Sequence, residues 1–551
     1  MQLTLRLPAL CLLTAAAFIF SSCSKTNKEG RYVPKNAAIV VLVNGESISS
    51  KLPWADVKQN ELFKQLYQDS TLEAYIKSAL DNPDNTGIDT KKDFLFFVQK
   101  DSIGGYVAIE GTVKDVAKFK QFNTDATKAG AEKEKDGIHF ISNNKMTASW
   151  EKEKFVIVID APELNDINKF SNMNDSSSAS MPAVKRDAVA VCTQIFALKE
   201  NNSLGKEAKF TELVKQKGDI HFWMNIGEFN TGTAGMAALS MLNMSKLYEG
   251  SLATATASFE DGKILIDTKS YAGKELSEIW KKYAGNKVNT DMIKNIPGKD
   301  VAVLFALNFK PEGIREFVKL AGLDGFINMG AAFIGFNLDD FIKANKGDIL
   351  FSMSDITTDS TGKPDMNVLF SASVGDKDAF GKLISAGNKL GKDKLGMGSP
   401  QIFYNTNDKL FAIGNNKESV NKFITAGGKS DFDFIDKISG GPAAGYVNFQ
   451  LLLKAFGKEA NRDSLDNIMY ESSLKMWDNL IVKGGGFEDG GSVQHVEINL
   501  VDKKSNSLKQ LNNYMGLVGK IQQEKKIIRD REFEAYAPVT EEPVTEAEPA
   551  N

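Results

Sequence analysis

The residues that could do chemistry in this chain are few and lie far apart. Its three histidines are His139, His221 and His495, and no two of them have the short spacing of a zinc-binding pair. Asp261 and Asp489 are candidate acid/base residues, but each precedes a glycine in an expected hairpin turn, where aspartate is common for backbone reasons. No nucleotide-binding loop, serine-nucleophile motif or zinc-protease motif is found. The sequence therefore nominates no catalytic residue, no cofactor and no metal, and we expect a protein that is not an enzyme.

The N-terminal residues predict export and attachment to a membrane. Residues 1–22 contain Arg6, then a short apolar run and two serines, as in a secretory signal peptide. The serines followed by Cys23 resemble a bacterial lipobox, in which the cysteine is acylated and becomes the mature N-terminus. We therefore expect lipidation at Cys23 and anchoring at the outer membrane, because Ser24 rather than aspartate follows it. The alternative is an ordinary secretory signal with an incidental cysteine.

Cys192 is then the remaining thiol, since Cys11 would leave with the signal peptide. No intramolecular disulfide is expected. Cys192 ends an apolar run that begins at Ala188, which we interpret as a strand. A buried structural thiol is expected here rather than a nucleophile, because no histidine lies nearby in the sequence.

Length and charge set broad limits on the protein. The 551 residues exceed what one core holds, so at least two large domains are expected. A hydrophobic content of 42%, a charged content of 25% and a net charge of -4 are typical of a globular protein and give no basic face for nucleic acid.

A duplicated motif predicts how the chain is organised. Phe-Glu-Asp-Gly occurs at 259–262 and again at 487–490, each time between two strand-like segments. Both copies predict a β-hairpin, and two similar hairpins indicate two similar halves. We place the halves at 32–290 and 295–518, after a lipidated tether at 23–31 and before a charged helix end and acidic tail at 519–551.

Other segments correspond in the same order in the two halves. A buried-strand run followed by asparagine occurs at Asn44 and Asn308, with weaker copies at Asn225 and Asn448, and we expect these asparagines to cap the helices that follow. Further matched segments are 92–97 with 347–352, 106–110 with 367–372, 139–141 with 401–404, and 155–159 with 410–413. Paired strands interrupted by single helices predict an α+β fold: two tandem, internally duplicated domains of antiparallel sheets with helices packed on one face.

Two unusually apolar segments are candidate binding elements. The segment 234–247 contains Met236, Met241 and Met244, and the segment 326–336 contains Phe333 and Phe336. The simplest interpretation is two core helices. The alternative is a Met- and Phe-lined groove for a hydrophobic partner or lipid, because methionine surfaces adapt to varied ligands.

The serine-cysteine motif, the Val-Pro-Lys-Asn-Ala-Ala opening at 33–38 and the two similar halves together resemble a Bacteroidota lipoprotein family known as domain of unknown function 4836. The resemblance covers nearly the whole mature chain. It implies an envelope lipoprotein and brings no activity or site residues. We expect a non-enzymatic binding or scaffolding role at the outer membrane, with an envelope protein as possible partner. The alternatives are a carrier of a hydrophobic ligand and an unrecognised hydrolase.

Overall fold

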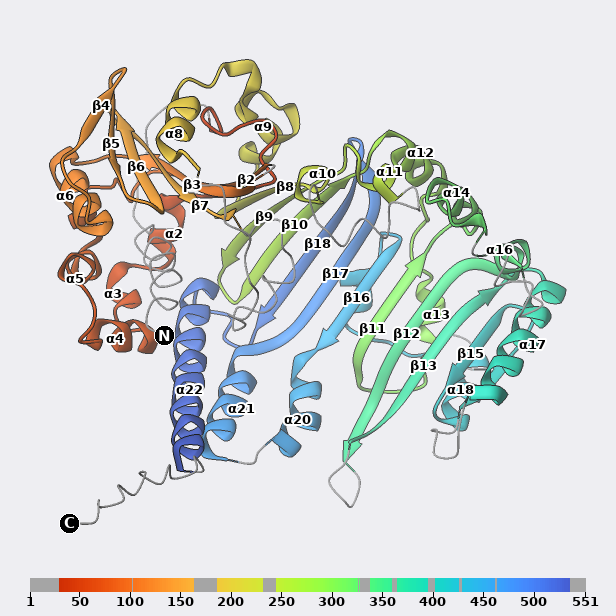
Figure 1. The fold of residues 1–551 in the computed structure, drawn as a ribbon. Helices are drawn as coiled ribbons and strands as arrows, with labels where there is room; N and C mark the ends of the chain where they lie inside the picture. The colour runs from red at the N-terminus through yellow and green to blue at the C-terminus, as the bar shows by residue number, and fades with distance from the viewer. Residues whose placement is uncertain are drawn as a thin grey trace, which may run out of the picture.

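The fold is built on one large antiparallel sheet. In the computed structural model the described residues are 29–101, 103–162, 186–230, 244–325, 327, 337–358, 364–394, 402–425, 429–460 and 463–535. They form an 18-stranded sheet with helices around it (Figure 1), so the predicted α+β class is confirmed.

The strands of the first half run from the outer edge to the centre of the sheet. In spatial order they are β4 (Lys133–Lys135), β5 (Ile138–Ser142), β6 (Met146–Glu151), β7 (Lys154–Asp160), β3 (Gly104–Thr112), β2 (Phe94–Asp101), β1 (Ile39–Val43), β8 (Ile220–Asn225), β9 (Leu252–Glu260) and β10 (Lys263–Tyr271).

The strands of the second half continue from the centre to the opposite edge. They are β18 (Gly491–Leu500), β17 (Trp477–Glu488), β16 (Ala443–Asn448), β11 (Val301–Asn308), β12 (Asn345–Thr358), β13 (Pro364–Val374), β15 (Leu410–Gly414) and β14 (Phe403–Thr406).

The two hairpins predicted from the duplicated motif are β9–β10 and β17–β18, and they lie side by side at the centre. Their turns use Gly262 and Gly490 at φ values of +67° and +80°, where a side chain would be strained. Antiparallel pairing of β10 with β18, which we call the seam, joins the halves into one sheet rather than the separate sheets expected. Asp267 pairs with His495 across the seam, and each is the fifth residue after its turn glycine.

From the seam outward, the order of strand pairing is the same in both halves. β10, β9, β8, β1, β2, β3, β7 and β6 correspond in turn to β18, β17, β16, β11, β12, β13, β15 and β14. One predicted match was wrong: β14 has the place of β6, not of the strand at 139–141, because it forms a hairpin with β15 as β6 does with β7. Descent of both halves from one copied module stays a prediction.

The helices have the following bounds. In the first half they are α2 (Gly45–Lys51), α3 (Trp54–Val57), α4 (Glu61–Gln68), α5 (Ala74–Asp81), η1 (Pro83–Thr86), α6 (Val116–Thr127), α8 (Ala188–Phe196), η3 (Glu200–Asn202), η4 (Leu204–Lys206), α9 (Ala208–Lys215), α10 (Ile226–Asn230), α11 (Met244–Tyr248) and α12 (Lys274–Tyr283). In the second half they are α13 (Thr290–Lys294), α14 (Glu312–Leu320), α16 (Leu338–Ala344), α17 (Lys377–Lys394), α18 (Lys417–Thr425), α19 (Ile435–Ile438), α20 (Phe449–Ala460), α21 (Ser464–Met476) and α22 (Ser507–Ala535).

Helices cover both faces of the sheet, whereas one covered face was expected. On β3, Ala108 packs into a cluster that includes Phe210 of α9, and the next residue, Ile109, packs into another cluster that includes Phe119 of α6. Successive strand residues point to opposite faces. The apolar runs on β3 and β7 therefore place apolar side chains on both faces, and both need cover.

The run at Cys192 is a helix, not the predicted strand. α8 begins after Asp187, whose side chain accepts a hydrogen bond from the backbone N–H of Ala190. A short alternating Ala-Val run fits either element, and the aspartate cap favours the helix. Cys192 is fully buried, and burial raises the pKa of its thiol to about 12.

The asparagine caps are confirmed at three of the four positions. Asn44, Asn225 and Asn448 accept hydrogen bonds from backbone N–H groups in the first turns of α2, α10 and α20. Asn308 does not cap α14. Its Oδ1 accepts a hydrogen bond of 2.6 Å from the backbone N–H of Asn286, and its Nδ2 donates one of 2.7 Å to Asp348.

Candidate functional site

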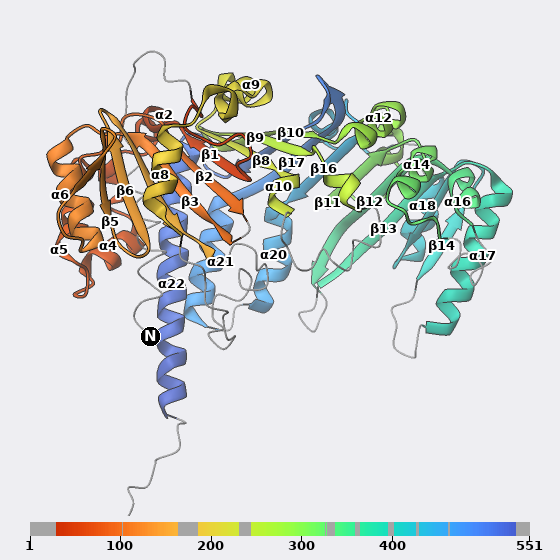
Figure 2. The ribbon, with the colours of Figure 1, turned by 45° about the horizontal axis from the view of Figure 1, so that its top comes forward.

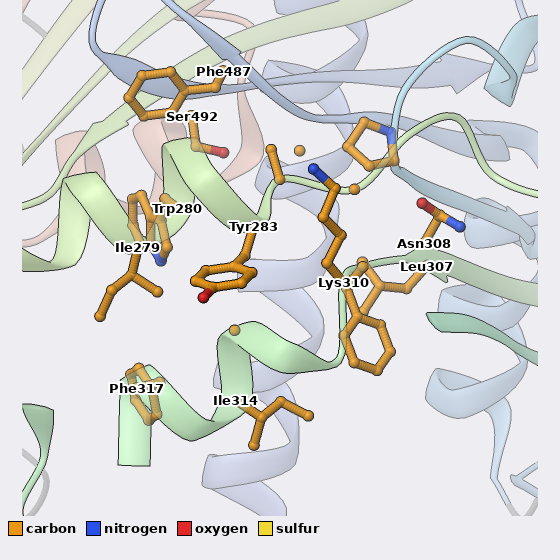
Figure 3. A pocket seen from close by; sticks show the side chains of 16 residues that line it. Ile279, Trp280, Tyr283, Leu307, Asn308, Lys310, Ile314, Phe317, Phe487 and Ser492 are labelled. Atoms are coloured by element: carbon orange, nitrogen blue, oxygen red, sulfur yellow. The ribbon is translucent and has the colours of Figure 1, made fainter. Parts of the chain in front are cut away.

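A pocket of about 400 Å³ lies beside the seam, where elements of both halves meet (Figure 3). We call it the seam pocket. It is lined by Ile279, Trp280, Tyr283, Ala284, Gly285, Leu307, Asn308, Phe309, Lys310, Gly313, Ile314, Phe317, Pro442, Gly485, Phe487 and Ser492. Its size is in the range of pockets that bind small molecules.

Two helices from different halves form one side of the seam pocket. On α12, Tyr283 comes four residues after Ile279 and three residues after Trp280. These spacings place all three side chains on one side of the helix. Gly313 lets α14 approach α12, since a Cβ at this position would come 2.7 Å from Cβ of Tyr283. Ile314 and Phe317 of α14 also line the seam pocket (Figure 3).

The link between the halves forms the base of the seam pocket. A Cβ at Gly285 would lie only 1.8 Å from the carbonyl oxygen of Asn308, so glycine is required where the link passes the end of β11. The hydrogen bond from Asn286 to Asn308 then holds the link against the end of β11. The asparagine that was expected to cap a helix therefore positions the seam pocket instead.

The seam pocket is mostly apolar. Among the described residues that line it, Lys310 carries the one charge, and its Nζ donates a 3.3 Å hydrogen bond to the carbonyl oxygen of Lys282. A hydrogen bond with Tyr283 and the nearby phenol charge raise the pKa of Lys282. No described lining residue is acidic, so the lining offers no carboxylate pair for acid/base chemistry.

The corresponding place in the first half is filled by side chains. Phe259 and Ile264, opposite each other in the first hairpin, pack against Ile48 of α2 and against Leu508 and Leu511 of α22. We call this group the closed cluster; Val43, Ile220, Ile266 and Ile498 complete it.

The seam pocket has matched residues at the same positions. Phe487 and Ser492 are opposite each other in the second hairpin, and Ser492 stands where the first hairpin has Ile264, in the second position after the turn glycine. Leu307 precedes Asn308 as Val43 precedes Asn44. A serine in place of an isoleucine removes apolar volume and so helps leave the seam pocket open.

A family model matches residues 31–426 of this chain; its description is domain of unknown function (DUF4836). The chain belongs to the DUF4836 family. This confirms the resemblance to domain of unknown function 4836, and the envelope lipoprotein stays a prediction. The family description names no activity, so the function of this DUF4836 member has to be argued from its own residues.

Other comparisons add little for this DUF4836 member. No curated protein matches it. A solved structure described as crystal form I of TP0453 matches with 10% sequence identity, covering 44% of this chain and 79% of that chain, at a TM-score of 0.21. A score this low carries no argument about fold or function.

Most of the site residues predicted from sequence lie outside the described residues. These are Cys23, Met236, Met241, Phe333 and Phe336, and for Met244, the first residue of α11, the side chain is not described.

The described end of the first apolar segment nevertheless lies near the seam pocket. Leu247 of α11 and Ala321, just after α14, belong to one cluster, against which Trp280 also packs. The Met- and Phe-lined groove itself stays a prediction.

The histidines and buried acids form no metal site in the described part of the chain. His139 stacks on Trp150 with ring centroids 5.2 Å apart, and His221 contacts the carbonyl oxygen of Gln216 at 2.9 Å. Glu110 is buried, one of its carboxylate oxygens has no partner, and burial raises its pKa to about 6. Glu110 packs inside the sheet of the first half, away from the seam pocket.

Sequence reasoning missed the aromatic lining of the seam pocket. Trp280 and Tyr283 belong to an amphipathic helix, and Phe487 was interpreted only as part of a hairpin motif. One signal was available: the position after the turn glycine that holds Ile264 in one copy holds Ser492 in the other.

None of the helices in the described part of the chain is long and apolar enough to cross a bilayer.

Proposed function

We propose that this protein is a non-enzymatic binding protein of the cell envelope, anchored to the outer membrane through acylated Cys23, and that its seam pocket binds an apolar ligand. The observation that carries the proposal is the seam pocket itself. It is about 400 Å³ in volume, lined by five aromatic residues and bordered by both halves.

The comparison with the closed cluster supports a binding role. A fold that fills this place in one half can fill it in the other, and leaving it open costs roughly 20 cal/mol of stability per Å² of cavity surface. The two helices and the inter-half link are held by close glycine contacts, so the seam pocket is formed before a ligand arrives. A preformed apolar pocket with few polar groups is typical of a small-molecule site.

The anchor supports the proposed location. The tether predicted at 23–31 would be short and would hold the protein near the membrane surface. Apolar molecules concentrate in membranes, which suits a protein with an apolar site.

The test uses the mature chain with Cys23→Ser, so that no detergent competes for the pocket. The probe is N-phenyl-1-naphthylamine, a neutral dye that fluoresces in apolar surroundings. We expect saturable binding at one site. Ser492→Ile, which restores the side chain of the closed cluster, should weaken binding at least tenfold, whereas Ser70→Ile, the same change at an exposed loop serine, should leave it unchanged. Equal binding by all three proteins, or none by any, would overturn the proposal.

A further inference from the structure

A row of aromatic side chains crosses the sheet of the second half next to the seam pocket. Phe305 of β11 is directly opposite Phe351 of β12, which is directly opposite Phe370 of β13. Directly opposite residues lie on the same face with their Cβ atoms about 5 Å apart. We call these three residues the aromatic row.

The aromatic row is exposed although its immediate neighbours are buried. The exposed fractions are 48% for Phe305 and 38% for Phe370, and Phe351 is half-buried. The preceding residues on these strands, Leu304, Leu350 and Leu369, are 1%, 1% and 3% exposed, because they point to the other face and form the core. Large apolar side chains grouped on a surface in this way mark an interaction site.

The matching positions of the first half are less exposed: one is buried and two are half-buried. They are Val41, Phe96 and Ile109, which pair in the same way on β1, β2 and β3. Ile109 is 4% exposed and packs with Phe119 of α6. In the second half α20 packs against β11 and β12, and α17 lies beyond β13 (Figure 2).

The aromatic row continues into the seam pocket. Leu307, which lines the seam pocket, is two residues from Phe305 on β11 and therefore on the same face, about 6.6 Å along the strand. The two inter-strand steps from Phe305 to Phe370 add roughly 10 Å. Because these two directions are perpendicular, the apolar surface extends roughly 12 Å from Leu307 to Phe370.

We propose that the seam pocket and the aromatic row form one trough for a long linear acyl chain. This inference rests on the proposed function and specifies its ligand. An acyl chain is apolar along its whole length, as are the aromatic row and most of the pocket lining. An extended peptide fits worse, because the row lies on the face of the sheet, where the backbone groups are already paired and cannot bond another strand.

The experiment measures displacement of N-phenyl-1-naphthylamine by octanoate, dodecanoate and octadecanoate below their micellar concentrations. We expect affinity to rise at least tenfold from octanoate to octadecanoate. The double variant Phe305→Ser, Phe370→Ser should bind octanoate as the wild type does and should lose most of that rise. The control is Met515→Ser, Ile527→Ser, which removes similarly exposed apolar side chains from α22, and it should keep the whole rise.

The outcomes separate the two proposals. If the dye binds but affinity does not depend on chain length, or if the double variant keeps the full rise, the trough is overturned and the seam pocket stands. If neither dye nor fatty acid binds, the proposed function fails as well. Because Phe305 and Phe370 are exposed, thermal melting of the double variant should stay close to that of the wild type, and a large loss would place them in the core and overturn the trough.

Discussion

The hairpins at Phe259 and at Phe487 have the same turn motif but different surroundings. Around Phe259, side chains from both halves fill the space and leave this residue 8% exposed. Around Phe487, the same kinds of elements leave a pocket of about 400 Å³. The shared order of strands therefore determines where a cavity can occur, and a few side chains determine whether it is filled.

A second matched pair shows the same division between scaffold and side chain. Glu110 on β3 and Ser371 on β13 have the same register relative to their neighbouring strands. Ser371 is fully buried and donates a 2.6 Å hydrogen bond to the carbonyl oxygen of Phe411, whereas Glu110 keeps an unpartnered oxygen. Both residues occupy the same position in the sheet, but their contributions to the free energy of unfolding should differ, and denaturation experiments can measure this difference.

The largest expected effect comes from opening the closed cluster. Ile264→Ser should lower the free energy of unfolding by about 3–5 kcal/mol, because it removes a buried side chain, leaves a cavity and buries a hydroxyl. Urea denaturation followed by circular dichroism measures this. A loss below about 1 kcal/mol would mean that the closed cluster is not part of the core and that the comparison with the seam pocket does not hold.

Removing the buried acid should change the pH dependence of stability. Since the pKa of Glu110 is raised from 4.5 to about 6 in the folded protein, its contribution favours folding at low pH and is lost as the pH rises through about 6. This loss is about 2 kcal/mol between pH 4.5 and pH 7. In Glu110→Gln the free energy of unfolding should not show this decrease when it is measured across the same pH range.

The control for this prediction is Glu418→Gln. A hydrogen bond with Lys422 lowers the pKa of Glu418, so this residue changes the free energy of unfolding at pH values below the tested range. If Glu110→Gln and Glu418→Gln both keep the slope of the wild type, Glu110 is not the group responsible.

Filling the seam pocket should stabilise the protein modestly. Ser492→Ile should raise the free energy of unfolding by about 1 kcal/mol, as cavity-filling changes commonly do.

Combining Ser492→Ile with Ile264→Ser exchanges the two residues between the hairpins. If the closed cluster and the seam pocket are equivalent places, the doubly changed protein should bind the dye in the first half, where Phe259→Trp fluorescence would report it.

The smallest effect is expected at the seam pair. His495 Nδ1 lies 2.7 Å from Asp267, but the two side chains are 43% and 61% exposed. His495→Gln should therefore change the free energy of unfolding by less than about 1 kcal/mol and leave dye binding unchanged. A loss above about 2 kcal/mol would show that the halves are joined by this contact rather than by β-pairing and the closed cluster.

Much of the fold could be predicted from local patterns. The turn glycines, the alternating strands and three asparagine caps depend on neighbours in the sequence, so they were visible without coordinates. Cys192 was misassigned because a short Ala-Val run fits a helix or a strand, and only its cap and packing decide. Asn308 failed as a cap because its partner, Asn286, comes from the link between the halves.

The seam pocket could not be predicted because its walls are distant in the sequence. Trp280 and Phe487 are brought together by the pairing of β10 with β18, which no local pattern specifies. The aromatic row is a similar case: each phenylalanine looks like an ordinary strand residue, and exposure depends on which helices cover that face.

The α+β class, the two hairpins and most of the matching order of elements could be predicted from the sequence alone, since these follow from turn chemistry and hydrophobic periodicity. The tertiary structure decided that the halves share one sheet, that helices cover both faces, and that one of two equivalent places stays open. The physical reason is that packing and cavity volume depend on side chains brought together from distant segments, so the effect of Ile264 or Ser492 depends on the side chains around it as well as on its own size.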